Sequence, residues 1–232
     1  MSLRTIAILQ ARINSTRLHG KIMLPLLGRP MIEQIYTRVS RATTLNRVIV
    51  AIPKGTWNDM REAVIPFNDF FLFDGDENDL VARYLACATL HQADVIVRIP
   101  CDNPCVDPAS IDKAVQWYRE WGCTFLSNTT DRVHGQWLDG VGAEVFSRSR
   151  LQWLEEKTRG HPEWREHPHR YFYERGGSST IFTPGRDEKT FRLDVNTQAD
   201  YDFINSIYDH FQRNDFTATE IVASLESMKV SS

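Results

Sequence analysis

The chain is poor in cysteine, with four such residues among its 232: Cys87, Cys101, Cys105 and Cys123. This number is too small for the dense disulfide framework of small secreted proteins. The pair formed by Cys101 and Cys105 has no second Cys/His pair at the spacing of a zinc site. We therefore expect buried structural thiols and no metal bound by cysteine.

The chain also lacks a long apolar segment and an excess of positive charge. No apolar run approaches the roughly 20 residues that cross a membrane, and no basic N-terminal segment is followed by an apolar core. The formal net charge is -3 and the isoelectric point is near 6.2, so no basic field favours nucleic acid. Hydrophobic residues make up 42% and charged residues 25%, as in ordinary globular domains. We expect a cytoplasmic protein that binds neither membranes nor nucleic acid.

Short apolar runs alternate with helical patterns over the first half of the chain. Runs typical of strands that are buried on both faces occur at residues 5–9, 48–52 and 95–99. Apolar residues recur at helical spacing over residues 30–42, and Asp107 with Pro108 supplies a cap and a first-turn proline for a later helix. This alternation predicts an α/β domain, in which a mostly parallel, mixed sheet is flanked by helices.

The second half of the chain is less regular. Strand-like patterns occur at residues 144–146, 180–183 and 191–195. Thr197 and Asp200 form a candidate capping box for a helix, and residues 219–228 predict a further one. Because no repeat, linker or clear boundary interrupts the chain, we predict one domain over residues 1–232. An inserted arm around residues 130–185 is expected to serve dimerisation or acceptor binding.

The loop after the first predicted strand, L-Q-A-R-I-N-S-T-R-L-H-G-K, carries three cations. In an open α/β sheet, ligands lie beyond the carboxyl ends of the strands, so this loop is a favoured place for a site. It has neither G-x-G-x-x-G nor the Walker motif, which disfavours a Rossmann dehydrogenase and a P-loop enzyme. The guanidinium groups of Arg12 and Arg17 can hold phosphate oxygens instead, and Lys21 adds a point charge. The alternative is that all three are solvated surface charges.

Written as A-R-x-x-S-x-R-L-x-x-K, this loop resembles the signature of the sugar-acid cytidylyltransferases. The similarity is greatest to the spore-coat polysaccharide biosynthesis protein F type, a relative of CMP-KDO and CMP-sialic acid synthetases. Further blocks resemble the family in the same order: L-L-G-R-P-M-I, F-D-G-D-E-N-D-L-V-A-R-Y, A-D-V-I-V-R-I-P-C-D-N-P, D-G-V-G-A-E-V-F-S, R-E-H-P and L-D-V-N-T-Q-A-D. The loop has His19 where the family usually has proline. We expect this change to be tolerated; the alternative is that His19 reaches the phosphates.

The resemblance implies a GT-A-like nucleotidyltransferase fold. It also implies a reaction that transfers CMP from CTP to a sugar or sugar-acid acceptor and releases pyrophosphate with the help of Mg²⁺. Carried over by position, Arg12, Ser15, Arg17 and Lys21 would hold the triphosphate. Fixed cations suit this chemistry because negative charge develops on the α-phosphate and on the departing pyrophosphate. The catalytic residues implied in this way are Arg12, Lys21 and Asp102.

Three side chains are candidate ligands of the Mg²⁺ ion. Asp102 follows a predicted strand, where the resemblance places a metal carboxylate; an Asp that starts a turn is the alternative. The second ligand is expected from L-D-V-N-T, because the family often has Asp at the position of Asn196. Asp194 is an additional carboxylate two residues earlier. Residues i and i+2 of a strand face the same side, so both can point at the metal, and the choice between them stays open.

The predicted acceptor contacts are Asp139, Glu144, Glu166 and His167. They fall in blocks that line the acceptor side in the family, and their side chains can hydrogen-bond a polyhydroxylated molecule. His167 is a candidate base. A solvated loop or a dimer contact is the alternative for each residue.

The predicted contacts of the nucleobase begin with Leu9, Gln10 and Ala11, whose backbone groups could approach the ring. Asp79 and Arg83, one helical turn apart, are further candidates for nucleotide binding. A surface ion pair between these two side chains is the alternative, since their spacing is i, i+4.

Two other functions compete with the cytidylyltransferase interpretation. A GT-A glycosyltransferase that uses a nucleotide-sugar donor would not need the R-x-x-S-x-R-L-x-x-K loop, because it handles no free triphosphate. A non-catalytic nucleotide- or sugar-binding protein would retain only the scaffold. No short motif identifies the acceptor.

Because relatives dimerise through the second half of the chain, where Trp137, Trp153 and Trp164 lie, we expect a homodimer.

Overall fold

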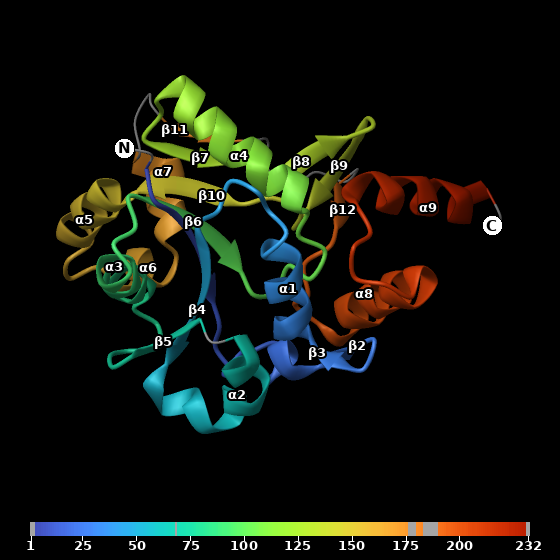
Figure 1. Cartoon of the computed structure of the whole chain (residues 1–232), viewed down its shortest axis with the longest axis horizontal. Coiled ribbons are helices and arrows are strands. Elements are labelled where there is room, and N and C mark those ends of the chain that lie inside the picture. Colours follow the sequence, from blue (N-terminus) through green and yellow to red (C-terminus); the bar gives the residue numbers. More distant parts are fainter. Residues whose placement is uncertain (1–2, 68, 176–179, 183–189, 231–232) are drawn as a thin grey trace.

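The computed structural model describes residues 3–67, 69–175, 180–182 and 190–230. Within this part of the chain, a seven-stranded sheet has the order β11-β7-β10-β6-β1-β4-β5 (Figure 1). Its strands are β1 (Thr5–Gln10), β4 (Arg47–Pro53), β5 (Phe70–Phe73), β6 (Val95–Pro100), β7 (Phe125–Ser127), β10 (Glu144–Ser147) and β11 (Thr180–Phe182). The two smaller sheets consist of β2 (Pro25–Leu26) with β3 (Arg29–Pro30), and of β12 (Thr190–Arg192), β9 (Gln136–Asp139) and β8 (Thr130–Val133).

The helices lie on both faces of the central sheet (Figure 1). They are α1 (Met31–Val39), α2 (Trp57–Val64), α3 (Leu80–Leu90), α4 (Pro108–Trp121), α5 (Arg148–Lys157), α6 (Pro162–Glu166), α7 (Pro168–Arg175), α8 (Gln198–Phe211) and α9 (Ala218–Val230). Short 3-10 turns are η1 (Lys21–Met23), η2 (Lys54–Thr56) and η3 (Ile65–Phe67). No described helix combines the length and the apolar character that a bilayer crossing requires.

The sheet is mixed but mostly parallel, as predicted. β1 runs parallel to β4 and to β6, and β4 runs parallel to β5. β10 lies antiparallel between β6 and β7. The carboxyl ends of β1 and β6 therefore meet at one edge, with Gln10 opposite Pro100. The loops after these two strands, which carry the predicted phosphate and metal residues, begin side by side.

Alternating residues of β1 build a core on each face of the sheet, because successive side chains of a strand point in opposite directions. Ala7 and Leu9 belong to the core that includes residues of α1, α2, α4 and α8. Ile6 and Ile8 belong to the core that includes residues of α3, α5 and α7. All four side chains are 0% exposed, which explains why this strand has an unbroken apolar sequence.

Two predicted helix caps are present in the structure. The Asp107 carboxylate accepts a hydrogen bond from the Ala109 N–H at 2.8 Å at the start of α4. Thr197 and Asp200 form a reciprocal capping box at the start of α8. Such caps satisfy N–H groups that have no partner within the helix. The cap at Thr197 also ends the preceding extended segment, which carries the candidate metal ligands.

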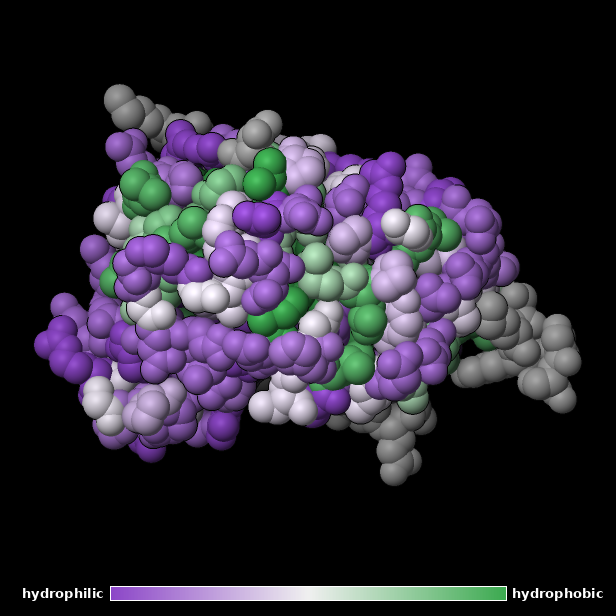
Figure 2. All heavy atoms as spheres, turned by 90° about the horizontal axis from the view of Figure 1, so that it is seen from below, coloured by the Kyte–Doolittle hydropathy of each residue, from purple (hydrophilic) through white to green (hydrophobic). Residues whose placement is uncertain are grey.

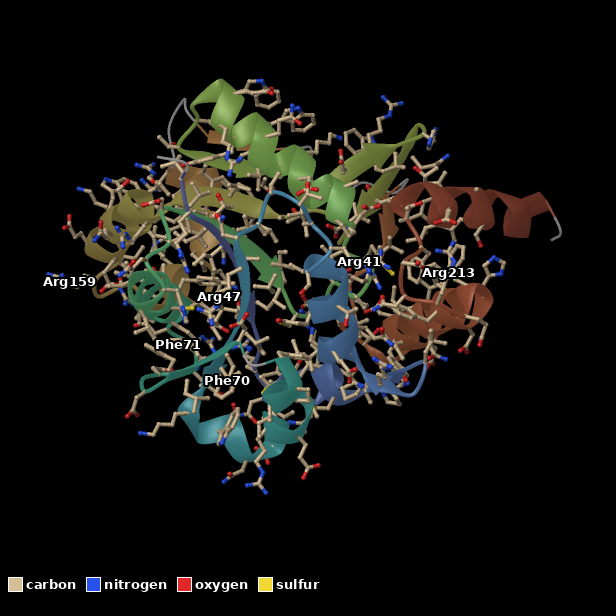
Figure 3. All side chains as sticks on the ribbon, in the orientation of Figure 1. Arg41, Arg47, Phe70, Phe71, Arg159 and Arg213 are labelled. Atoms are coloured by element: carbon tan, nitrogen blue, oxygen red, sulfur yellow. The ribbon has the colours of Figure 1, made fainter. Side chains whose placement is uncertain are left out.

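The segment between α8 and α9 is tied to α1 by the buried Arg38, and to the residues that follow α1 by the exposed Arg41. The Arg38 guanidinium, 1% exposed, donates to the carbonyl oxygens of Val106, Asn214 and Phe216 at 2.7, 3.0 and 2.8 Å. Arg41 at the end of α1 also donates to the Asn214 carbonyl, and Figure 3 shows it on the side of α1 toward α8 and α9. The C-terminal helices are thereby joined to the layer that covers the sheet.

Two sequence predictions differ from the observed arrangement. The strand expected over 191–195 ends at Arg192, because Leu193 N–H then bonds to Asp139 O and Val195 N–H to Asp102 O, which belong to different segments. Residues 130–185, expected to form an inserted arm, contribute β10 and β11 to the central sheet. Residue 183, the last of the strand expected over 180–183, lies outside the described residues. The role of this range in dimerisation or acceptor binding stays a prediction.

The surface view in Figure 2 is largely hydrophilic, with hydrophobic residues gathered in separate patches. Large hydrophobic side chains that are at least half exposed among the described residues are Leu3, Ile65 and Leu90, at 53%, 51% and 65%. They lie on different elements of the chain. Scattered exposure of this kind is ordinary for a globular domain and does not by itself mark a binding surface.

Candidate active site

A cavity of about 480 Å³ lies at the carboxyl edge of the central sheet, beyond β1 and β6. Twelve of the predicted site residues line it: Gln10, Arg12, Ser15, Arg17, Lys21, Asp102, Asp139, Glu144, Glu166, His167, Asp194 and Asn196. They come from loops that are far apart in the sequence. The structure thus brings together most of the phosphate, metal and acceptor candidates, although their individual roles stay predictions.

Four other candidates, Leu9, Ala11, Asp79 and Arg83, do not line this cavity. Leu9 and Ala11 are 0% exposed. Leu9 lies between β4 and β6 in the sheet, and the Ala11 N–H donates to Ala51 O at 3.1 Å. Gln10 is the member of the predicted base-binding trio that reaches the cavity wall.

Asp79 and Arg83 make separate contacts instead of the ion pair considered for them. Asp79 caps α3 through the Ala82 N–H at 3.0 Å and pairs with Arg165 at 2.7 Å. Arg83 is 1% exposed, and burial lowers its pKa. Its Nη2 donates to Glu77 O at 2.9 Å, and its Nη1 to Ala11 O at 3.4 Å. Arg83 therefore ties the start of the first loop to the turn before α3.

The first loop is folded back on itself. The N–H groups of Ser15 and Gly20 both donate to Ile13 O, at 2.9 and 3.0 Å. Gly20 has φ = 66°, a left-handed conformation that favours glycine, and it begins the η1 turn at Lys21. This turn directs Arg17 and Lys21 toward one cavity. His19 is exposed and does not line it, so the structure does not support contact with phosphates there.

Lys21 is the most enclosed of the three cations in the first loop. Its residue is 9% exposed, and its Nζ lies 2.8 Å from Asp102 Oδ2 and 2.6 Å from the Val195 carbonyl oxygen. Asn196 Oδ1 is a third oxygen at 3.3 Å. The Val195 N–H donates to Asp102 O at 2.7 Å, which holds the two segments side by side. These contacts join the first loop, the end of β6 and the segment after β12.

Arg17 and Arg12 contact different segments around the cavity. Arg17 Nη2 donates to Asn196 Oδ1 at 2.7 Å, and the Asn196 amide in turn donates to Asp194 Oδ2. Arg12 Nη1 donates to Asn78 Oδ1 at 2.8 Å and pairs with Glu166 Oε1 at 3.2 Å. Each cation of the loop thus already has oxygen partners, which an incoming anion would replace.

Asp194 and Asn196 share one side of their extended segment, as the i, i+2 spacing predicted. Both line the cavity and are 6% and 4% exposed. Asp194 also accepts from Arg192 Nε at 3.3 Å. Asn196 Oδ1 faces Lys21 and Arg17, whereas Asp194 lies behind the Asn196 amide. The strand itself is shorter than expected, but the bond from the Asn196 amide to Asp194 Oδ2 keeps the two side chains next to each other.

Oxygen donors of the kind that Mg²⁺ prefers surround the Lys21 ammonium. Among residues 3–67, 69–175, 180–182 and 190–230, no three His, Cys, Asp or Glu side chains converge as a complete metal cage. Asp102, Asn196 and the Val195 carbonyl nevertheless offer hard oxygens at one place. Mg²⁺ usually takes one or two protein carboxylates and completes its shell with water and phosphate oxygens. The donor set therefore fits this ion.

A buried ion pair at another part of the cavity wall was not predicted. Arg98 on β6 lies opposite Glu144 on β10, and Arg98 Nη1 is 2.7 Å from Glu144 Oε2. The side chains are 7% and 3% exposed. Burial disfavours the charged Arg98, but the Glu144 carboxylate raises its pKa above the ordinary value. The sequence did contain an indication of this pair, because an Arg inside the buried run V-I-V-R-I-P needs a charge partner.

Tyr173 and His169 on α7 also line the cavity and were missed. The Tyr173 hydroxyl contacts Ser127 Oγ at 3.2 Å and Glu144 Oε1 at 3.4 Å. Burial is the main reason that the pKa of His169 is lowered to about 4; the Glu144 carboxylate opposes this shift, and Arg98 adds to it. Burial also lowers the pKa of His167. Both imidazoles are thus neutral near pH 7 and can accept a hydrogen bond from a hydroxyl group.

His169 makes stability depend on pH in a predictable direction. The unfolded chain binds a proton near pH 6.5, whereas folded His169 does so only near pH 4. Unfolding therefore takes up a proton between these values, and the free energy of unfolding falls as the pH drops, by at most about 1.4 kcal/mol per pH unit. We expect His169→Gln to reduce this slope in urea titrations between pH 6.5 and 4.5. The exposed His210→Gln is the control, and an equal slope in wild type and His169→Gln would contradict the prediction.

Known proteins that are similar to this chain match it over nearly its whole length. A family model described as cytidylyltransferase matches residues 6–222. Spore coat polysaccharide biosynthesis protein SpsF of Bacillus subtilis (strain 168) is 27% identical over 227 residues, 94% of this chain and 92% of that protein. A cytidylyltransferase structure from Leptospira borgpetersenii serovar Hardjo-bovis (strain JB197) has a TM-score of 0.85 at 27% identity, covering 99% and 96% of the chains. The structure of CMP:2-keto-3-deoxy-manno-octonic acid synthetase complexed with CTP shares the fold, with a TM-score of 0.66, 18% identity and coverage of 89% and 99%.

Proposed function

Since the chain belongs to the cytidylyltransferase family, we propose that it transfers CMP from CTP to a hydroxyl group of a sugar or sugar-acid acceptor. Pyrophosphate is released, and the product serves the biosynthesis of a surface polysaccharide or glycan. The observation that carries this proposal is the convergence of Arg12, Arg17 and Lys21 on the cavity that Asp102 also lines. The likeness to a spore coat polysaccharide biosynthesis protein supports the biological context.

The three cations act by neutralising and orienting the triphosphate. Arg12 and Arg17 come from one short loop and present planar donors to phosphate oxygens. Lys21 stabilises the negative charge that develops on the α-phosphate and on the leaving pyrophosphate. Ser15, in the same loop, offers its hydroxyl and lines the cavity. Their oxygen partners in the free protein keep these cations in place until the phosphates replace those partners.

Asp102, together with Asn196 or Asp194, is proposed to hold Mg²⁺. The ion would supply positive charge that offsets the negative charge of the triphosphate. Asp102 is held at the end of β6 by the bond between its carbonyl oxygen and the Val195 N–H. Asn196 presents its carbonyl oxygen toward the same place, since its amide nitrogen is occupied by Asp194.

The acceptor is proposed to bind beside the Arg98–Glu144 pair. Asp139, Glu144 and His167 line this cavity with Tyr173, and they offer both donors and acceptors to a polyhydroxylated molecule. Glu166 holds Arg12 in the free protein, so its place in the acceptor site depends on Arg12 turning toward phosphate. The homodimer and the cytoplasmic location remain predictions.

The test is to incubate the protein with Mg²⁺, each of the four nucleoside triphosphates and a panel of sugars and sugar acids. We expect pyrophosphate release with CTP that depends on the acceptor, and a product whose mass equals acceptor plus CMP. Cleavage of a nucleotide-sugar donor instead would indicate a glycosyltransferase. Binding of CTP without turnover by any panel member would favour a nucleotide-binding protein and would contradict the proposal.

A further inference from the structure

Lys21 occupies a position that a metal ion could also occupy. Its Nζ contacts three oxygens that come from two separate segments: Asp102 Oδ2 at 2.8 Å, Val195 O at 2.6 Å and Asn196 Oδ1 at 3.3 Å. The Lys21 side chain is only 11% exposed. The ammonium group donates to carboxylate and carbonyl oxygens, and these oxygens replace part of the water that would surround it in solution.

The same oxygens are those proposed to hold Mg²⁺, and this inference rests on that part of the proposed function. A divalent ion and an ammonium group within hydrogen-bond distance of the same carboxylate would repel each other strongly in a partly buried site. We propose that Lys21 fills the metal position in the nucleotide-free protein. The divalent ion then binds well only when a triphosphate draws the Lys21 ammonium away.

The geometry of the loop allows this exchange. The backbone of Lys21 is held by a bond from its N–H to Leu18 O at 3.3 Å, while its Nζ lies at the end of a flexible four-carbon stem. Arg17 contacts the same Asn196 oxygen and belongs to the same loop. A triphosphate that engages Arg17 would thus also attract Lys21. The nucleotide both supplies phosphate oxygens to the ion and frees Asp102 for it.

A purely structural role is the competing explanation. Buried ion pairs occur without any metal, and removing one partner of such a pair destabilises the protein. Under that explanation, removing the Lys21 charge would lower stability but would leave Asp102, Asn196 and Val195 without affinity for a divalent ion. A loss of stability is expected under both explanations, so it does not separate them. Metal affinity measured without nucleotide does, because only the proposal predicts that it rises.

The experiment measures binding of Mn²⁺ alone, by the loss of its free-ion electron paramagnetic resonance signal, with no nucleotide or acceptor. We expect Lys21→Met to bind Mn²⁺ at least about tenfold more tightly than wild type, because Asp102 loses its ammonium partner. Asp102→Asn in the Lys21→Met background should remove the gain. Lys54→Met is the matched control, because Lys54 pairs with Asp74 at 2.7 Å on the surface.

Equal Mn²⁺ affinity of wild type and Lys21→Met would overturn the proposal. If Lys21→Met does not fold, Lys21→Gln, which keeps a polar side chain at this position, is measured in the same way and should show the same gain. Tight Mn²⁺ binding to nucleotide-free wild type would also overturn the proposal. The function is scored separately by pyrophosphate release from wild type. An active enzyme with no Mn²⁺ gain in Lys21→Met refutes the exchange alone, and a Mn²⁺ gain without CTP turnover refutes the function alone.

Discussion

Replacing Asp102 with Asn is expected to lower CTP-dependent pyrophosphate release by about 10³-fold while the protein stays folded. Asn keeps the size of the side chain but loses the negative charge that pairs with Lys21 at 2.8 Å. The same change removes the carboxylate proposed for the metal, so transition-state charge is no longer balanced. The Asp102 side chain is 28% exposed, and its carbonyl still accepts from the Val195 N–H. The variant loses the charge partner of Lys21 and therefore some stability, but it should stay folded because the Lys21 ammonium keeps Val195 O and Asn196 Oδ1 as partners.

The measurement is steady-state pyrophosphate release together with the melting temperature of each variant. Asp74→Asn is the matched control, because Asp74 also pairs with a lysine but is 80% exposed and does not line the cavity. Its turnover should equal that of wild type. Turnover of Asp102→Asn within a few-fold of wild type would refute the role of Asp102.

Glu144→Leu is expected to destabilise the fold by about 3–5 kcal/mol, because it leaves a buried guanidinium without its charge partner. Arg98 and Glu144 are neighbours across β6 and β10, and the two side chains are 7% and 3% exposed. Leu offers no acceptor in its place, and water can hydrate a guanidinium that is 7% exposed only in part. The Tyr173 hydroxyl would lose its contact with Glu144 Oε1 as well.

The double variant Arg98→Met with Glu144→Leu separates charge from packing. Replacing both partners with apolar groups removes the unpaired charge, so most of the lost stability should return in urea unfolding measurements. A double variant as unstable as Glu144→Leu would show that the pair matters for its shape and not for its charge. The pair of Arg29 in β3 and Glu33 in α1, with side chains 66% and 28% exposed, provides a control, since its removal should cost less than about 1 kcal/mol.

Much of the site follows from the sequence because it depends on local chain direction. The cations of the first loop and Asp102 follow strands whose buried apolar runs are easily found, and the carboxyl ends of parallel neighbours meet. The family predicted from the loop and the later blocks is confirmed by the family model over residues 6–222. The shared orientation of Asp194 and Asn196 followed from the two-residue period of an extended backbone.

Other parts of the site depend on contacts between distant segments, which a single sequence does not reveal. The pairing of Arg98 with Glu144 requires β10 to insert antiparallel between β6 and β7. Arg83 was predicted to contact the nucleotide, with a surface ion pair to Asp79 as the alternative, yet α3 packs so that this side chain is buried against the first loop. His169 reaches the cavity only because α7 packs on the face of the sheet that holds Phe125 and Phe146.

A crystal structure of the protein with CTP and Mn²⁺ tests the central claim most directly. We predict triphosphate oxygens within about 3.2 Å of Arg12, Arg17 and Lys21, and an anomalous peak for Mn²⁺ between a phosphate oxygen and Asp102. A nucleotide bound elsewhere, with these three cations still on their present partners Glu166, Asn196 and Asp102, would contradict the account.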